Sequence, residues 1–236
     1  MIDTKALREK VLDLAIRGKL VPQDPNDEPA SVLLERIRAE KEQMVKDGKL
    51  KAKDIKNDTF IYRGEDNLHY EKFQDGTVKC IEDEIPFEVP EGWVWARMSS
   101  LTHDLPYGTS KKSSSRGEIA VLRMGNLQQG EIDYTDLVYS SDKEDIGKYL
   151  LTAGDLLFNR TNSSEWVGKT AIYRGELAAI YAGYLIRIRP FLEGEYLNCV
   201  MNSGYIKEIC LLVKTDAVNQ SNINISFPVK AFCSYD

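Results

Sequence analysis

The stretch VPQDPNDEPA, residues 21–30, contains three prolines and cannot continue a helix, so it separates the segments on either side. Before it, residues 4–17 carry an apolar stripe at helical spacing, and Gly18 suits the left-handed residue that follows a helix end. After it, the sequence SVLLERIRAEKEQMVKDGK predicts a second amphipathic helix with Pro29 in its first turn. Together they predict a helical hairpin over residues 1–50 that needs another surface to pack on.

The character of the sequence changes at Ile85. Residues 51–84 are rich in lysine and then mixed, which is typical of a linker, with one short extended piece at residues 60–62. From Ile85 onward, Pro/Gly punctuation and alternating tryptophans indicate a strand that enters a domain. Further strand candidates are residues 119–124, 137–139, 155–158, 169–173 and 184–189, and residues 195–213 have a helical pattern despite Gly204.

These elements predict an α+β fold, in which a helical hairpin precedes a domain of short twisted strands with long loops and flanking helices. We place the helical region at residues 1–50, the linker at 51–84 and the domain at 85–226. Residues 227–236 form a tail of different character.

The charge of the chain limits the partners that it can have. A net charge of −6 argues against non-specific adhesion to nucleic acid. The acidic excess lies mostly in residues 1–92, which hold 16 Lys and Arg against 21 Asp and Glu. Residues 106–130, by contrast, carry four basic side chains against Glu118 alone, so a local phosphate-binding face is compatible with the overall charge.

Motifs for catalysis are absent from the sequence. It contains no GxGxxG after a strand, no GxxxxGK[ST], no GxSxG and no HExxH. His103, beside Asp104, is the only candidate general base, and a loop residue is the simpler interpretation. The four cysteines are scattered and form no CxxC pair, and the chain has two histidines, which argues against a zinc site. We expect a binding protein with no catalytic residue, metal or cofactor.

No apolar run reaches the length of a membrane span, and the N-terminus MIDTKALREK lacks a hydrophobic signal core. We therefore expect a cytoplasmic protein that does not associate with membranes.

Polar and basic side chains gather in four segments that could contact DNA. Lysine, arginine and small hydroxyl residues can hold phosphate oxygens, whereas arginine, asparagine and glutamine can bond to base edges. The candidates in YGTSKKSSSRG (107–117) and VLRMGNLQQG (121–130) are Ser110, Lys111, Lys112, Arg116, Arg123 and Asn126. Those in and after NRTNSSE (159–165), and in VNQSNINIS (218–226), are Asn159, Arg160, Thr161, Asn162, Ser163, Lys169, Gln220 and Asn222.

Composition alone does not separate these candidates from ordinary surface loops, because the same residues are common turn formers. Arg123 could equally pair with Glu118, and Arg160 with Glu165. The loop that begins at Asn159 could also bond to itself and shape a site without touching a ligand.

The run LREKVLDLAIRGKLVPQDPNDEPASVLLERIRAEKEQMVKDGKLK strongly resembles the N-terminal region of specificity (S) subunits of bacterial Type I restriction-modification enzymes. The stretch DEIPFEVPEGWVWARM resembles the entry into the first target recognition domain of that family. GDLLFNRTNSSEWVGKTAIY and DAVNQSNINIS resemble late landmarks of the same domain. The resemblance spans roughly residues 5–226.

The resemblance implies a non-catalytic protein that recognises one half of a bipartite double-stranded DNA target. It further implies partnership with modification (methyltransferase) subunits and, through them, with the restriction subunit that brings the nuclease. The tail SFPVKAFCSYD departs from the family, where a long helix is expected. The chain is then either a half-subunit that could form a homodimer through residues 4–49, or a fragment. A fragment could also act mainly as a protein-interaction scaffold with little DNA binding.

Overall fold

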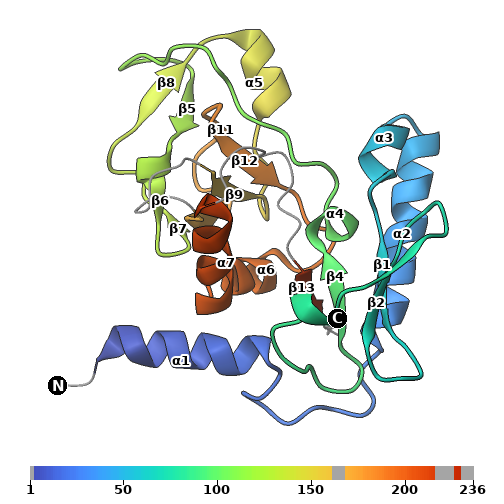
Figure 1. The fold of residues 1–236 in the computed structure, drawn as a ribbon. Coiled ribbons are helices and arrows are strands. Elements are labelled where there is room, and N and C mark those ends of the chain that lie inside the picture. Colours follow the sequence, from blue (N-terminus) through green and yellow to red (C-terminus); the bar gives the residue numbers. More distant parts are fainter. Residues whose placement is uncertain (1–2, 161–167, 216–225, 230–236) are drawn as a thin grey trace. The chain divides into compact units, whose positions relative to one another are not determined.

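The computed structural model describes residues 3–160, 168–215 and 226–229, and its elements are shown in Figure 1. The chain forms two compact units. The first consists of Met1–His103 together with Asn219–Asp236, and the second is Asp104–Val218. Helices and strands occur in both units, so the expected α+β class is confirmed.

Both predicted N-terminal helices are present. Helix α1 spans Thr4–Ile16 and ends where Gly18 takes a φ of +63°, as its position in the sequence predicts. Helix α2 spans Ala30–Lys46, and Pro29 is its N-cap rather than part of its first turn. The two helices pack on different elements instead of along each other. The end of α1 meets Phe87, whose ring centre lies 4.3 Å from the Arg17 guanidinium carbon. Helix α2 packs instead on two short helices, α3 (Ala52–Ile55) and α4 (Met98–Leu101).

Residues 51–84 are not a linker. They contain α3 (Ala52–Ile55) and a three-stranded antiparallel sheet of β1 (Phe60–Arg63), β2 (His69–Lys72) and β3 (Val78–Cys80). Asp75 accepts from the backbone N–H of Thr77 in the turn between β2 and β3. The sequence did not predict this sheet, because the segment is rich in charged residues. One of the buried positions of the sheet is itself a carboxylate, Glu71, which lies opposite Ile61 on the neighbouring strand.

Two strands of the first unit that are distant in sequence pair with each other. Strand β4 (Val94–Arg97) pairs antiparallel with β13 (Ser226–Val229), so that Ser226 lies opposite Arg97. Helix α4 (Met98–Leu101) follows β4 directly. The beginning of the segment expected to be an atypical tail therefore belongs to a regular element of the fold.

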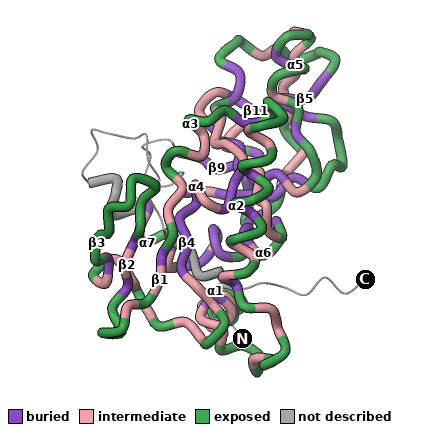
Figure 2. The backbone as a smooth tube through the Cα atoms, turned by 90° about the vertical axis from the view of Figure 1, so that its right-hand side faces the viewer, coloured by how far each residue is buried: buried purple, intermediate pink, exposed green. Residues whose placement is uncertain are grey.

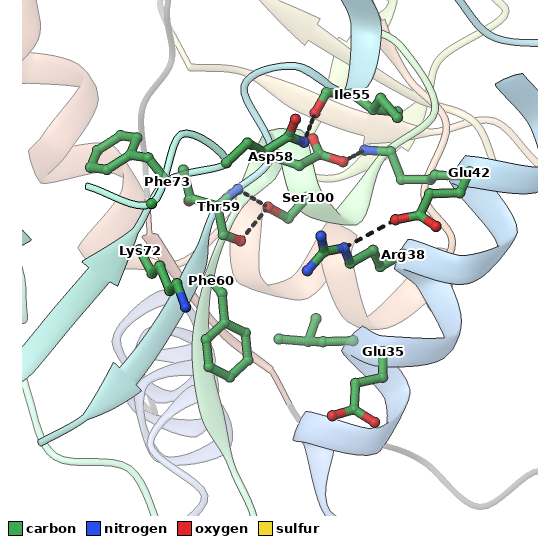
Figure 3. A pocket seen from close by; sticks show the side chains of 14 residues that line it. Glu35, Arg38, Glu42, Ile55, Asp58, Thr59, Phe60, Lys72, Phe73 and Ser100 are labelled. Carbon is green, nitrogen blue, oxygen red and sulfur yellow. Dashed lines mark hydrogen bonds and ion pairs between the residues drawn. The ribbon is translucent and has the colours of Figure 1, made fainter. Parts of the chain in front are cut away.

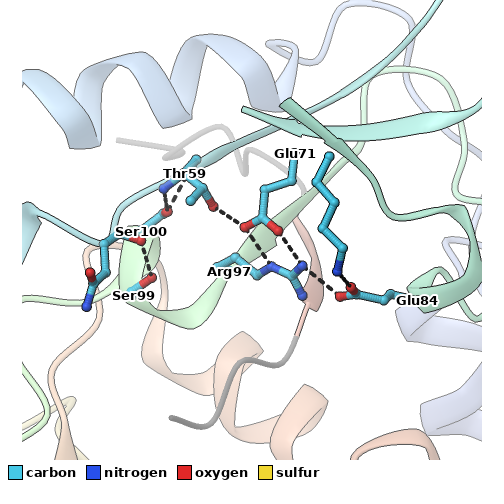
Figure 4. Close-up of polar contacts among 8 residues, drawn as sticks. Thr59, Glu71, Glu84, Arg97, Ser99 and Ser100 are labelled. Carbon is cyan, nitrogen blue, oxygen red and sulfur yellow. Dashed lines mark hydrogen bonds and ion pairs between the residues drawn. The ribbon is translucent and has the colours of Figure 1, made fainter. Parts of the chain in front are cut away.

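A buried ionic network holds β2 to β4 (Figure 4). The Arg97 guanidinium donates to both carboxylate oxygens of Glu71, at 3.0 and 2.6 Å, and to Glu84 at 2.7 Å. Thr59 donates its hydroxyl to Glu71 at 2.6 Å, and Lys79 donates to Glu84 at 2.8 Å. Burial alone would raise the pKa of the Glu71 carboxyl, but the hydrogen bonds from Arg97 and Thr59 outweigh it and lower that pKa.

The second unit is built on short buried strands in two three-stranded sheets, ordered β10-β9-β12 and β11-β5-β8. Among the described strands of these two sheets, β11 and β5 pair in parallel and the other pairs are antiparallel. Buried positions follow β5, β9 and β11 in Figure 2. The strands of these sheets are β5 (Ile119–Leu122), β8 (Val138–Ser140), β9 (Leu156–Asn159), β10 (Thr170–Ile172), β11 (Ala179–Tyr181) and β12 (Leu185–Ile188).

All five strand candidates after residue 118 are confirmed, and three further features are added. The sequence analysis missed β11 and the helix α5 (Lys143–Tyr149). It also missed the small hairpin of β6 (Leu127–Gln128) and β7 (Glu131–Ile132). The helix predicted at 195–213 is two helices, α6 (Gly194–Met201) and α7 (Gly204–Thr215). The first helix ends just before Gly204, the residue that the sequence analysis had placed inside a single helix.

Replacing Arg97 with methionine should destabilise the first unit by about 3–5 kcal/mol, because the buried Glu71 carboxylate would remain in the interior without its cation, whereas Glu84 would keep Lys79. The matched control is Arg36→Met, which removes an exposed pair with Glu28 and should cost less than about 1 kcal/mol. Urea unfolding followed by tryptophan fluorescence would measure both, since Trp95 is buried in β4. Equal small losses would mean that the network adds nothing to stability.

Candidate nucleic-acid interface

The first residues of the polar segment 107–117 are hydrogen-bonded to the sheets of the second unit. Tyr107 forms a bridge with Ile186 of β12, and the Thr109 amide donates to the carbonyl of Tyr181 at 2.9 Å. Gly108 lies between them, and a Cβ at that position would be 2.1 Å from the Tyr181 carbonyl oxygen. Only glycine fits this approach, so the start of the segment is fixed rather than freely solvated.

Lys111 forms ion pairs with carboxylates of the protein itself. Its Nζ lies 2.8 Å from Asp142, 3.3 Å from Asp145 and 3.6 Å from Glu144. The hydrogen bond to Asp142 is the largest of the causes that raise the pKa of Lys111, and the same bond lowers the pKa of Asp142. A lysine with three carboxylates around it offers little net positive charge to a phosphate.

Two of these three carboxylates, Asp142 and Asp145, also have structural roles. Asp142 is the N-cap of α5 and accepts from the backbone N–H of Asp145 at 2.9 Å. Asp145 is buried and accepts a hydrogen bond from the Thr109 hydroxyl. The cluster therefore ties the polar segment to the start of α5.

The remaining candidates of this segment are Ser110, Lys112 and Arg116, and all three are exposed. Within the part of the chain that the structure describes, the side chains of Lys112 and Arg116 take part in no ion pair or hydrogen bond. Their charges are therefore available to an anionic partner.

Arg123 and Asn126 belong to a turn that precedes β6, where both have structural roles. Asn126 is buried, accepts from the Arg123 backbone N–H, and donates to the carbonyls of Asp133 and Asp136 at 2.8 and 2.9 Å. The Arg123 guanidinium pairs with Asp136 at 2.8 Å. The alternative pairing expected for Arg123 was with Glu118, so the type of interaction was foreseen and the partner was not.

The loop that begins after Asn159 is carried by a hairpin of β9 and β10. The Asn159 amide donates to the Lys169 carbonyl, and the Gly168 amide donates to the Asn159 carbonyl, both at 2.9 Å. Asn159 itself is fully buried, whereas Lys169 is half-buried at the base of the loop. Thr161, Asn162, Ser163, Gln220 and Asn222 lie outside the described residues.

Tyr107 and Arg160 come together at the surface, although 53 residues separate them in the chain. The Arg160 guanidinium carbon lies 4.4 Å from the centre of the Tyr107 ring, and the guanidinium donates a hydrogen bond to the phenol oxygen. Tyr107 is 41% exposed. The sequence analysis did not name Tyr107, although an aromatic residue at the start of a basic segment was a signal that could have suggested it.

A groove of about 410 Å³ lies in the first unit, between α2 and the β1–β2 hairpin (Figure 3). Four of its charged lining residues are paired with one another: Arg38 donates to Glu42 at 3.2 Å, and Lys41 lies 2.5 Å from Asp58. Burial lowers the pKa of Lys41 and raises that of Asp58. None of the predicted site residues lines this groove.

In the described ranges, no group of His, Cys, Asp and Glu side chains could hold a metal ion. No helix among these residues is both long and apolar enough to cross a membrane.

Comparisons with known proteins give similarities to a single kind of protein. The Type I restriction enzyme EcoAI specificity subunit of Escherichia coli is 35% identical over 203 residues, which is 84% of this chain and 30% of that protein. The EcoEI specificity subunit of the same species is 48% identical over 97 residues, which is 41% of this chain and 13% of that protein. The chain thus spans about a third or less of these relatives. No protein-family model matches it.

Among solved structures, the crystal structure of the HsdS subunit from Thermoanaerobacter tengcongensis is 19% identical with a TM-score of 0.45. The likeness covers 61% of this chain and 35% of that chain. It is too weak to carry an argument about the site.

Replacing Gly108 with alanine should destabilise the second unit by about 2 kcal/mol, because the new methyl group would overlap the Tyr181 carbonyl and displace the polar segment. The control is Gly147→Ala in α5, where a Cβ meets nothing within 4 Å. That change should stabilise by up to about 1 kcal/mol, since alanine is the better helix former. Urea unfolding measures both, and a neutral Gly108→Ala would contradict the close approach.

Proposed function

Since the chain belongs to the family of type I restriction enzyme specificity subunits, we propose that it recognises one half of a bipartite double-stranded DNA target. The observation that carries this proposal is the identity of 35% to one such subunit along 84% of the chain. In this role the chain directs methyltransferase and nuclease subunits to DNA and performs no chemistry itself. The match covers 30% of that relative, and a span of this size is compatible with one recognition domain.

The geometry of the second unit supports a DNA-binding role. Buried strands hold the polar segment that begins at Tyr107 and the residues at both ends of the stretch between β9 and β10. Functional side chains are commonly presented by segments that a rigid scaffold supports in this way. Lys112 and Arg116 are exposed cations suited to phosphate oxygens. Arg160 is suited to a base edge. Asn126 and Asn159 are left out of the proposed contact surface, because both are buried within the protein.

Partners are proposed from the first unit. Leu7 and Val11 lie on the apolar stripe of α1 and are 55% and 40% exposed. Such a stripe supports docking of a modification subunit, which would link the chain to the restriction subunit, or formation of a homodimer. The cytoplasm is the compartment where these partners and DNA meet. The second candidate function, a scaffold with little DNA binding, is favoured by the net charge of −6.

A binding selection tests the proposed function. The purified chain, with and without modification subunits, is offered a random-sequence duplex library at low and moderate salt. Enrichment of one motif of about three to five base pairs is the expected result for a single recognition domain. If no motif emerges even with modification subunits present, the scaffold function replaces DNA recognition.

The two neighbouring lysines provide a sharper prediction. Lys112→Gln should weaken DNA binding and reduce the salt dependence by about one phosphate contact, because its charge is available. Lys111→Gln should change the salt dependence much less, because three carboxylates already surround that lysine. Binding to a single duplex, measured by fluorescence anisotropy across a series of salt concentrations, compares the two slopes. Equal slopes would show that Lys111 leaves its carboxylates to bind DNA.

A further inference from the structure

We propose that a groove of the first unit, between the proline-rich loop before α2 and the turn before β4, binds an extended segment of a partner protein. The segment carries a lysine or arginine beside an apolar residue. The groove consists of two adjoining hollows, one acidic and one close to neutral, and each takes one of these side chains. The proposal goes beyond DNA recognition and does not depend on it.

The acidic hollow has a volume of about 560 Å³. Among the described residues that line it are four carboxylates and no lysine, arginine or histidine; the carboxylates are Asp24, Asp27, Glu28 and Glu91. Glu28 pairs with Arg36 at 2.8 Å. The side chain of Asp24 accepts from the neutral donors of Asn26, at 2.9 and 3.0 Å, and Glu91 is exposed and forms no ion pair within the described ranges. The hollow therefore keeps a negative charge that a cation of a partner would neutralise.

The neutral hollow has a volume of about 310 Å³ and shares Glu91, Trp93 and Val94 with the acidic one. Its lining also contains apolar side chains: Ile61, Val89 and Pro90. Apart from the shared glutamate, its exposed charges are Arg63 and Glu88, which lie 3.5 Å apart and offset each other. An uncharged, apolar side chain therefore suits this hollow better than a second cation.

The walls of the acidic hollow are joined by hydrogen bonds of the chain itself. The Trp93 indole N–H donates to the side-chain oxygen of Gln23 at 2.8 Å, and the Ala30 amide donates to the Gly92 carbonyl at 2.8 Å. Gln23 in turn donates to the Gly18 carbonyl at 2.7 Å. These bonds hold the proline-rich loop against the turn before β4, so the groove is preformed. A preformed site loses little freedom when a ligand binds.

Other classes of ligand fit the groove less well. Nucleic acid is repelled, because its phosphates would meet carboxylates that no cation offsets. A metal ion needs several ligands around one point, and in the described ranges no group of His, Cys, Asp and Glu is arranged to hold one. A lysine or arginine needs no such arrangement and can lay its methylene stem along apolar walls. In an extended segment, at about 3.3 Å per residue, a nearby side chain reaches the neutral hollow.

A peptide selection tests the proposal. The full chain is offered a displayed library of random nonapeptides at moderate salt, and the affinities of the selected peptides are measured by fluorescence anisotropy. The enriched peptides should carry a lysine or arginine with an apolar residue within about three positions. Replacing either residue of a selected peptide, the cation with glutamine or the apolar residue with serine, should weaken binding by about tenfold.

Two double variants locate the binding site. Asp24→Asn with Glu91→Gln removes two charges of the acidic hollow and keeps an oxygen that can accept from Asn26. Glu40→Gln with Glu65→Gln is the matched control, because it removes two exposed charges of the same unit outside both hollows. The first double variant should bind the selected peptides about tenfold more weakly and with less dependence on salt. The control should stay within about twofold of wild type, and the unfolding midpoints should change little, because all four residues are exposed.

A selection that enriches no basic peptide would overturn the proposal, and so would selected peptides that bind both double variants equally well. Either result leaves DNA recognition by the second unit untouched, because the duplex selection is a separate measurement. A failed duplex selection, in turn, leaves the peptide groove standing.

Discussion

The buried guanidinium of Arg97 is the constraint on which the first unit depends. A cation in the interior must be neutralised and fully hydrogen-bonded, and the chain meets this need with Glu71 from β2 and Glu84 from the segment before β4. The three-stranded sheet that supplies Glu71 therefore has to lie against β4. Because β4 also pairs with β13, the same short strand connects the small sheet to the segment that follows the second unit. A strand of four residues thus contacts both the small sheet that precedes it and a strand more than 100 residues later in the sequence.

Much of the fold could be predicted from the sequence where burial follows a simple period. The apolar stripe and Gly18 give α1 almost to the residue, and continuous apolar runs give β5 and β9. The small sheet was missed because its inner face includes Glu71 and His69, which resemble solvent-exposed residues in a sequence. Helix α5 was missed for a similar reason: its sequence KEDIGKY is mostly polar, and its start depends on a cap from Asp142. Tertiary partners, rather than local propensity, decide such elements.

The candidate site was predictable only in part, because composition names polar side chains without naming their partners. Asn126 and Asn159 are the residue type that binds adenine, yet the first holds a turn and the second is buried at the end of a strand. Lys111 and Lys112 are neighbours of the same type, but only Lys111 faces the carboxylates at the start of α5. The geometry of the backbone decides between the two lysines, and Gly108, three residues before Lys111, helps to fix that geometry through its close approach to the Tyr181 carbonyl.

Tyr107 shows what is missing from an argument based on residue types. It is not charged or an amide, so a search for DNA-binding side chains passes over it. Its relation to Arg160 depends on the placement of two distant segments on one sheet. The contact between Tyr107 and Arg160 therefore cannot be predicted from the residue types of either segment alone, because it exists only once the sheet has brought the two segments together.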